Sequence, residues 1–177
     1  MEQKVSVWKV NLTNGLILGL TGIVYSLIIY FLDLSLNKVQ GYVFMLVQLA
    51  LLFFLLKSYR DNYMHGQIAY GQSVGAGVII CLYYAIIMAV FIYILYAVID
   101  PGLVAKQLAA AEEDMMKKGL PQVAIDAGMA IAAKMTKPPI MSVFSIFVNL
   151  ASGTILSMII SIFIKKEANP LIDMPAN

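Results

Sequence analysis

Few side chains in this 177-residue sequence have the type and spacing that enzyme or metal chemistry requires. His65 is the only histidine and has no second histidine to share a metal ion, so we interpret it as a surface residue. Cys81 is the only cysteine, and we interpret it as a small apolar packing residue. Glu112, Glu113 and Asp114 are consecutive, and three consecutive residues of a helix point in different directions. They therefore predict a solvated surface rather than a cation site.

Small polar residues also gather between residues 140 and 164. They are Ser142, Ser145, Asn149, Ser152, Gly153, Ser157 and Ser161. At about 100° per residue they occupy roughly half of a helix circumference. Serine chemistry needs a base, and the single histidine lies on a different element. We therefore expect no catalytic residue, no metal ligand and no cofactor-binding residue in this chain, and we predict that it is not an enzyme.

The composition places the chain in a membrane. It is 61% hydrophobic and 12% charged, whereas soluble proteins carry about 25% charged residues. Asp, Glu, Lys and Arg are missing from residues 10–32, 39–56, 62–99 and 138–164. A membrane-spanning helix needs about 20 largely apolar residues, so each interval can cross a bilayer once. The runs lack the alternation of barrel strands, and backbone groups must be satisfied in lipid, so we expect helices.

These intervals predict an all-α polytopic membrane protein with a bundle of four transmembrane helices. We expect one membrane domain over residues 1–177, with spans at about 11–32, 41–56, 72–99 and 140–164. Asp100-Pro101 is a helix-start signal, and Gly119 and Pro121 separate two weakly amphipathic segments. Residues 100–139 are therefore predicted to form an extramembrane helical hairpin between the third and fourth spans. Ion pairs are expected on its first helix, between Glu113 and Lys117 and between Asp114 and Lys118.

Small residues predict where the spans pack together. In the first span the small and polar residues share an arc of about 80°: Asn11, Gly15, Gly19, Gly22 and Ser26. In the third span the corresponding face carries Gly71, Gly75, Ala85 and Ala89. Because apolar helices gain little by leaving lipid, close contact at small residues is what favours their association. Gln48 and Asn149 lie at similar predicted depths, and we expect a hydrogen bond between them.

The distribution of basic residues predicts the orientation. Placing the N-terminus inside assigns six Lys and Arg residues to each side, so the total does not decide. In the first hairpin, Lys4 and Lys9 precede the span and only Lys38 follows it. We therefore expect both termini in the cytoplasm and residues 100–139 outside, in a bacterial inner membrane. The net charge is +2 and no basic run exceeds two residues, which argues against a nucleic-acid partner.

Several local features together resemble a known family. These are a short first hairpin, Gly71-Gln72-Ser73, Asp100-Pro101, an acidic helical segment with clustered methionines, and a last span ending in Lys165-Lys166. In this combination the chain resembles the domain of unknown function 4199 family (DUF4199), small polytopic inner-membrane proteins of Bacteroidota. The resemblance covers nearly the whole chain. It implies four membrane helices with an extramembrane segment between the last two, and it implies no activity and no functional residues.

Two functions remain open at this point. The first is a non-enzymatic structural or interaction subunit, a scaffold whose spans and outer segment contact the lipid bilayer, a second copy of the chain or another membrane protein. The second is a carrier of a small solute or lipid that uses the polar face of the fourth span. Transport sites usually contain intramembrane ionisable residues, broken helices or repeated halves, and none is visible here. The first function is therefore preferred.

Overall fold

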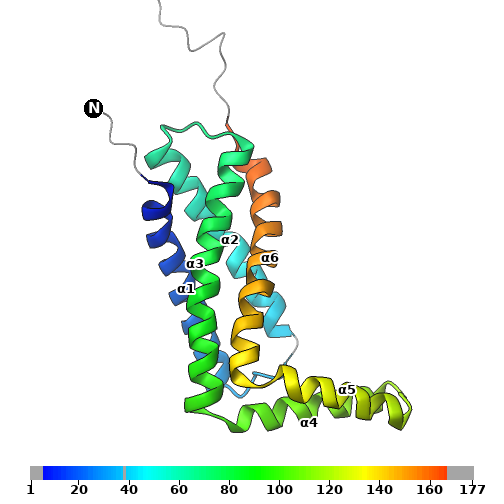
Figure 1. Cartoon of the computed structure of the whole chain (residues 1–177). Coiled ribbons are helices and arrows are strands. Elements are labelled where there is room, and N and C mark those ends of the chain that lie inside the picture. Colours follow the sequence, from blue (N-terminus) through cyan, green and yellow to red (C-terminus); the bar gives the residue numbers. More distant parts are fainter. Residues whose placement is uncertain (1–5, 38, 167–177) are drawn as a thin grey trace, which may run out of the picture.

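The computed structural model describes residues 6–37 and 39–166. Within these residues the chain forms helices joined by short loops, and Figure 1 shows the order of the elements. The elements are α1 (Val7–Phe31), α2 (Val39–Tyr63), α3 (Tyr70–Ile94), the π-helical turn η1 (Leu95–Ile99), α4 (Gly102–Lys117), α5 (Gln122–Met135) and α6 (Pro138–Ile164). The predicted all-α membrane bundle is confirmed.

Four of these helices are long and apolar enough to cross a membrane. They are α1, α2, α3 with η1, and α6, of 25, 25, 30 and 27 residues. At 1.5 Å per residue even the shortest is about 37 Å long, which exceeds the ~30 Å hydrocarbon core. The span predicted at 41–56 lies within the longer α2, because Lys57, Arg60 and Asp61 continue the helix beyond its apolar part.

The helix α3 lies at the centre of the bundle, between α1 and α6, and α2 crosses obliquely behind α3 and α6 (Figure 1). Gly15, Gly19 and Gly22 are buried on α1, and a Cβ added at any of them would collide with an α3 side chain. The predicted seam on the first span is thus confirmed. Small residues allow this approach because the two backbones can come close without displacing side chains.

The predicted seam on the third span is only half right. Ala85 and Ala89 are buried, but Gly71 and Gly75 are exposed and a Cβ on either would meet nothing within 4 Å. The close contact is made instead by Gly77, where a Cβ would collide with Ser157 of α6. The physical reason is the helix rotation: residues two positions apart differ by about 200°, so the choice of glycine selects the opposite face.

Hydrogen bonds also join α3 to α6. The hydroxyl groups of Ser161 and Ser73 are 2.8 Å apart and both residues are fully buried. Nearer the other end, the hydroxyl of Ser142 donates to the carbonyl oxygen of Ala89 at 2.7 Å. Between these two hydrogen bonds along the same interface, Gly153 contacts Cys81. Much of the polar face of α6 is therefore directed at α3 rather than at an open channel.

One end of the bundle is basic and closed by backbone contacts. The ends of α2 and α6 and the start of α1 all lie at this end, opposite the hairpin (Figure 1). Ile68, in the α2–α3 loop, exchanges two backbone hydrogen bonds with Lys166, at 2.9 and 3.0 Å. The guanidinium of Arg60 donates to the carbonyl oxygen of Ile164 at 3.1 Å. These bonds connect the second half of α2 to the end of α6.

The α4–α5 hairpin lies across the other end of the bundle and extends to one side (Figure 1). Its first helix is held by a 2.6 Å hydrogen bond from the Gln107 amide to the Tyr96 hydroxyl. At its start, Asp100 accepts hydrogen bonds from the Tyr30 hydroxyl at 3.3 Å and from the Gly102 amide at 3.0 Å. The hairpin is otherwise closed on itself, with Met115 of α4 resting against Gly128 of α5.

Candidate functional site

The residues whose side chains could take part in catalysis or metal binding do not lie close together. His65 lies in the α2–α3 loop with a backbone φ of 51°, beside Lys166 in a shallow depression. The serines of α6 donate to backbone carbonyl groups or to Ser73, and each hydroxyl therefore has a partner that is not a base. Among residues 6–37 and 39–166, no three His, Cys, Asp or Glu side chains could hold one metal ion.

The acidic residues of α4 form the predicted ion pairs. Glu113 and Lys117 are 2.6 Å apart, and Asp114 and Lys118 are 2.9 Å apart. The hydrogen bond from Lys117 to Glu113, together with the charge of Glu113, raises the pKa of Lys117. The four side chains are between 41% and 70% exposed, so these pairs contribute little to folding stability. The charged face of α4 is a solvated surface, as the sequence predicted.

The hydrogen bond predicted between Gln48 and Asn149 is wrong. The Asn149 amide donates to the Ser145 carbonyl oxygen of its own helix at 2.8 Å. Gln48 lies opposite a part of α6 further along the chain, from Ser152 to Leu156. Equal depth was inferred from the sequence alone, and the oblique crossing of α2 shifts the two helices relative to each other. Because Asn149 is satisfied within α6, it gains nothing by reaching across the bundle.

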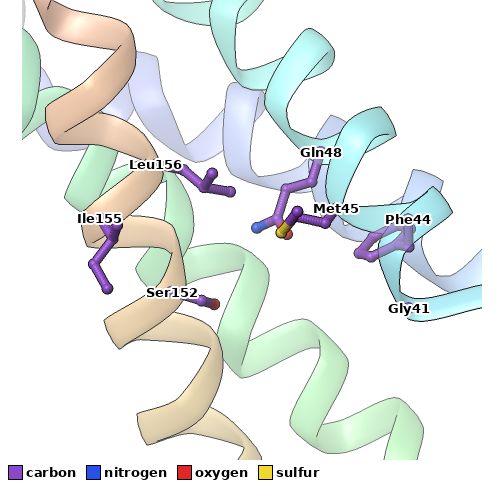
Figure 2. A pocket seen from close by; sticks show the side chains of 7 residues that line it. All are labelled: Gly41, Phe44, Met45, Gln48, Ser152, Ile155 and Leu156. Atoms are coloured by element: carbon purple, nitrogen blue, oxygen red, sulfur yellow. The ribbon is translucent and has the colours of Figure 1, made fainter. Parts of the chain in front are cut away.

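A cavity of about 370 Å³ lies where that hydrogen bond was expected. It is lined by Gly41, Phe44, Met45 and Gln48 of α2 and by Ser152, Ile155 and Leu156 of α6. Figure 2 shows the Gln48 side chain extending from α2 toward α6, with its amide nitrogen in the space between the two helices. Met45 and Ile155 are 47% and 59% exposed, so the cavity opens at the lateral surface of the bundle.

Gln48 is the chemically unusual group in this cavity. Its side chain is only 6% exposed, and its amide nitrogen Nε2 has no hydrogen-bond partner. Among the residues described, this is the single buried side-chain nitrogen or oxygen without a partner. Leaving a buried donor unsatisfied costs about 1–3 kcal/mol. The surrounding side chains of Phe44, Met45 and Leu156 have no acceptor oxygen, and the Ser152 hydroxyl, which donates to its own helix, makes no hydrogen bond with Nε2.

The cavity exists because α2 is packed along only half of its length. In its second half, Leu52, Leu56 and Tyr59 are at most 4% exposed. In its first half, Gln48 is the only buried residue, while Tyr42 remains 68% exposed. The helix therefore loses contact with α6 at Gln48. Sequence reasoning identified Gln48 but did not identify the rest of the site.

A signal for the remaining residues was present in the sequence. Gly41, Phe44, Met45 and Gln48 are spaced by 3, 1 and 3 residues, which places them on one helix face of about 100°. This face begins at the membrane edge and contains a donor at its deep end. The sequence could not indicate which helix lies across from it.

Comparison with protein families gives one match. The model of the family described as "Protein of unknown function (DUF4199)" matches residues 13–166, so the chain belongs to the DUF4199 family. This match confirms the resemblance inferred from the sequence. Comparisons with curated proteins and with solved structures gave no match. The chain is therefore a membrane protein of a family with no assigned activity.

Proposed function

We propose that this protein is a non-enzymatic interaction subunit of a bacterial inner membrane, in which the four spans anchor the α4–α5 hairpin as a docking element for another membrane protein. The observation that carries this proposal is an apolar stripe on α5, formed by Val123, Ala127, Ala130 and Ile131. These residues share a face of about 100° and are all exposed. Val123 and Ile131 are 81% and 65% exposed.

The stripe has no cover within the described chain. The opposite face of α5 carries Ile125, which is buried, and Gly128, which contacts α4. The hairpin itself extends beyond the bundle (Figure 1), so the stripe is not covered by α1, α2 or α3. Exposed apolar stripes on soluble segments are typical of protein–protein or membrane contacts.

The composition of the hairpin favours a protein partner over lipid headgroups. Helices that lie on a membrane surface usually carry several Lys or Arg residues on the polar face and Trp, Phe or Leu on the apolar face. On α5 the only basic residue is Lys134, and the stripe consists of Val, Ile and Ala. On α4 two lysines are already paired with acidic residues. The attraction to anionic lipid is therefore weak.

Photocrosslinking in native membranes tests this proposal. We expect a photoreactive amino acid at position 123 or 131 of the full chain to give a protein adduct of fixed stoichiometry, and one at Lys118 to give none. In variants Val123→Asp and Ile131→Asp the same partner should no longer copurify, whereas Ala133→Asp, an exposed control on another face of α5, should retain it. Adducts that contain only lipid, or equal loss in all three variants, would contradict a protein-docking role.

The orientation is part of the same proposal. The start of α1 and the ends of α2 and α6 lie at the end of the bundle opposite the hairpin (Figure 1). These segments carry Lys9, Lys57, Arg60 and Lys165, which supports cytoplasmic termini under the positive-inside rule. In a Cys81→Ser background, Gly119→Cys should react with an impermeant maleimide in cells whose outer membrane is permeabilised. Lys165→Cys should react only after the inner membrane is opened as well. The reverse pattern would place the hairpin in the cytoplasm.

The carrier alternative has less support. It requires access to the polar face of the fourth span, but Ser142 and Ser161 of that face are bonded to α3, and Ser157 contacts Gly77. Ser152 of that face lines the cavity between α2 and α6, whose exposed lining residues Met45 and Ile155 lie at the lateral surface of the bundle. A cavity of this kind can bind a molecule without providing a path across the membrane.

A further inference from the structure

The cavity between α2 and α6 contains a buried polar group, the Gln48 amide, within a mostly apolar lining. We infer that it binds a membrane-dissolved apolar molecule through a carbonyl group, which accepts a hydrogen bond from the Gln48 amide. Three properties of the site support this: the unpartnered donor, its position along α2, and the size and lining of the cavity.

The donor defines the chemistry of the ligand. The Gln48 side chain is 94% buried, and its Nε2 is directed into the cavity with no acceptor in reach (Figure 2). An amide nitrogen only donates, so the complementary ligand group is an acceptor such as a carbonyl oxygen. In a low-dielectric site the unsatisfied donor is costly, and an acceptor that satisfies it gains specificity as well as affinity.

The depth of Gln48 excludes an ordinary phospholipid carbonyl as that acceptor. Gln48 lies seven residues from Gly41 and eight from Leu56, which are the ends of the apolar part of α2. Measured along α2 at 1.5 Å per residue, it is therefore about 10–12 Å from either end, in the middle of the apolar part of this helix. Ester carbonyls of diacyl phospholipids lie in the interfacial region outside the ~30 Å core.

The lining and volume suit a molecule that dissolves in the hydrocarbon. At about 370 Å³ the cavity falls within the 300–1,000 Å³ range of small-molecule sites. Phe44, Met45 and Leu156 provide an aromatic ring and two flexible apolar chains around the donor, and Met adapts well to irregular ligands. The lateral opening beside Ile155 permits entry from the bilayer.

Two kinds of membrane molecule share this chemistry. An isoprenoid quinone has ring carbonyls and a long hydrocarbon tail, and an acyl ester without a charged headgroup has one carbonyl on a hydrocarbon chain. Both can place an acceptor near the centre of the bilayer. The experiment therefore uses one probe of each kind and a third probe that lacks a carbonyl.

The test observes the Gln48 amide directly by NMR. The full chain, labelled with ¹⁵N-glutamine, is placed in phosphatidylcholine nanodiscs, and the Gln48 side-chain signal is assigned by its loss in Gln48→Leu. We expect a decyl-substituted benzoquinone or methyl palmitate to shift this signal saturably, and the probe that binds more tightly identifies the source. Hexadecane should leave the signal in place, and the side-chain signals of Gln72 and Gln122 provide internal controls in the same spectrum.

A binding measurement completes the test. Retention of the preferred carbonyl probe by protein-containing nanodiscs should fall about tenfold in Gln48→Leu, which corresponds to the loss of one hydrogen bond. Retention of hexadecane should not change. Thr154→Ala removes a hydroxyl of α6 that does not line the cavity and that donates to its own helix at 2.7 Å, so this variant should bind as the unmodified chain does. This comparison separates the Gln48 donor from a general effect of removing a polar group from the bundle.

Three results would overturn the inference. The first is a Gln48 signal that neither carbonyl probe shifts. The second is an equal shift with hexadecane, which would indicate apolar filling without a hydrogen bond. The third is a Gln48 amide that retains magnetisation exchange with water at saturating probe, which would make water the occupant. Because Gln48→Leu removes an unpaired buried amide, we expect the variant to fold and the binding comparison to be valid.

Discussion

The two halves of this bundle are built differently. Along the α1–α3–α6 interfaces, Gly15, Gly77 and Gly153 permit close backbone contact, and buried hydroxyl groups are paired. Along the first half of α2 most side chains are exposed, although Phe44 packs against aromatic rings of α1 and α3, and the amide nitrogen of Gln48, the one buried residue there, has no hydrogen-bond partner. A lipid-embedded fold gains its stability from close packing and satisfied polar groups. The closely packed half therefore provides stability, and the open half is the region available to bind a ligand.

The largest effect should come from filling a close contact. Gly77→Leu places a side chain where Ser157 of α6 and Leu56 of α2 already lie, and we expect destabilisation by about 3 kcal/mol. At Gly41, on the open half, an added Cβ meets nothing within 4 Å, and Gly41→Leu should change stability by less than about 0.5 kcal/mol. Unfolding by sodium dodecyl sulfate in mixed micelles measures both. Equal losses of stability in the two variants would show that the helices are packed equally closely at both positions.

A second pair of variants compares the two halves of α2 itself. Leu56 is fully buried, and Leu56→Ala should destabilise the bundle by about 2 kcal/mol, since it leaves a cavity between helices. Leu46 is 63% exposed, and Leu46→Ala exchanges contacts with lipid only, so its effect should be near zero. Midpoints of thermal unfolding in detergent would rank the variants. A stronger effect at Leu46 would indicate that the first half of α2 is covered in solution.

The smallest effects should have opposite signs. Ser161→Ala removes a paired hydroxyl and leaves Ser73 unsatisfied, so we expect a loss of about 1 kcal/mol. Gln48→Leu removes an unpaired buried amide and should raise stability by about 1 kcal/mol in the absence of ligand. The same unfolding assay on lipid-stripped protein measures both changes. A loss of stability in Gln48→Leu would mean that the amide has a structural partner.

Local sequence patterns were sufficient for the elements of the fold. Charge-free intervals located the four spans, and the start signal at Asp100-Pro101 and the break at Gly119 located the hairpin helices. The i,i+4 spacing was enough to predict the ion pairs of α4, because both partners lie on one helix. The glycine stripe of α1 was read correctly for the same reason: its residues share a face whatever the neighbour is.

Contacts between helices required the tertiary structure. The sequence could not decide between Gly75 and Gly77, because both fit a small-residue pattern and only the rotation of α3 against α6 selects one. It paired Gln48 with Asn149 by depth, whereas the oblique crossing of α2 places Gln48 opposite Ser152 and Leu156. The backbone pairing of Ile68 with Lys166 joins positions 98 residues apart and has no local signature.

By itself, the sequence determined that the chain is helical, membrane-embedded and divided into four spans and a hairpin, because these properties depend on hydropathy and on residues close together in the chain. Only the tertiary structure decided that α3 is central, that α2 separates from α6 at Gln48, and that a cavity with an unpaired amide remains there. Those properties depend on the angles at which helices cross, which are set by many weak packing contacts between distant residues.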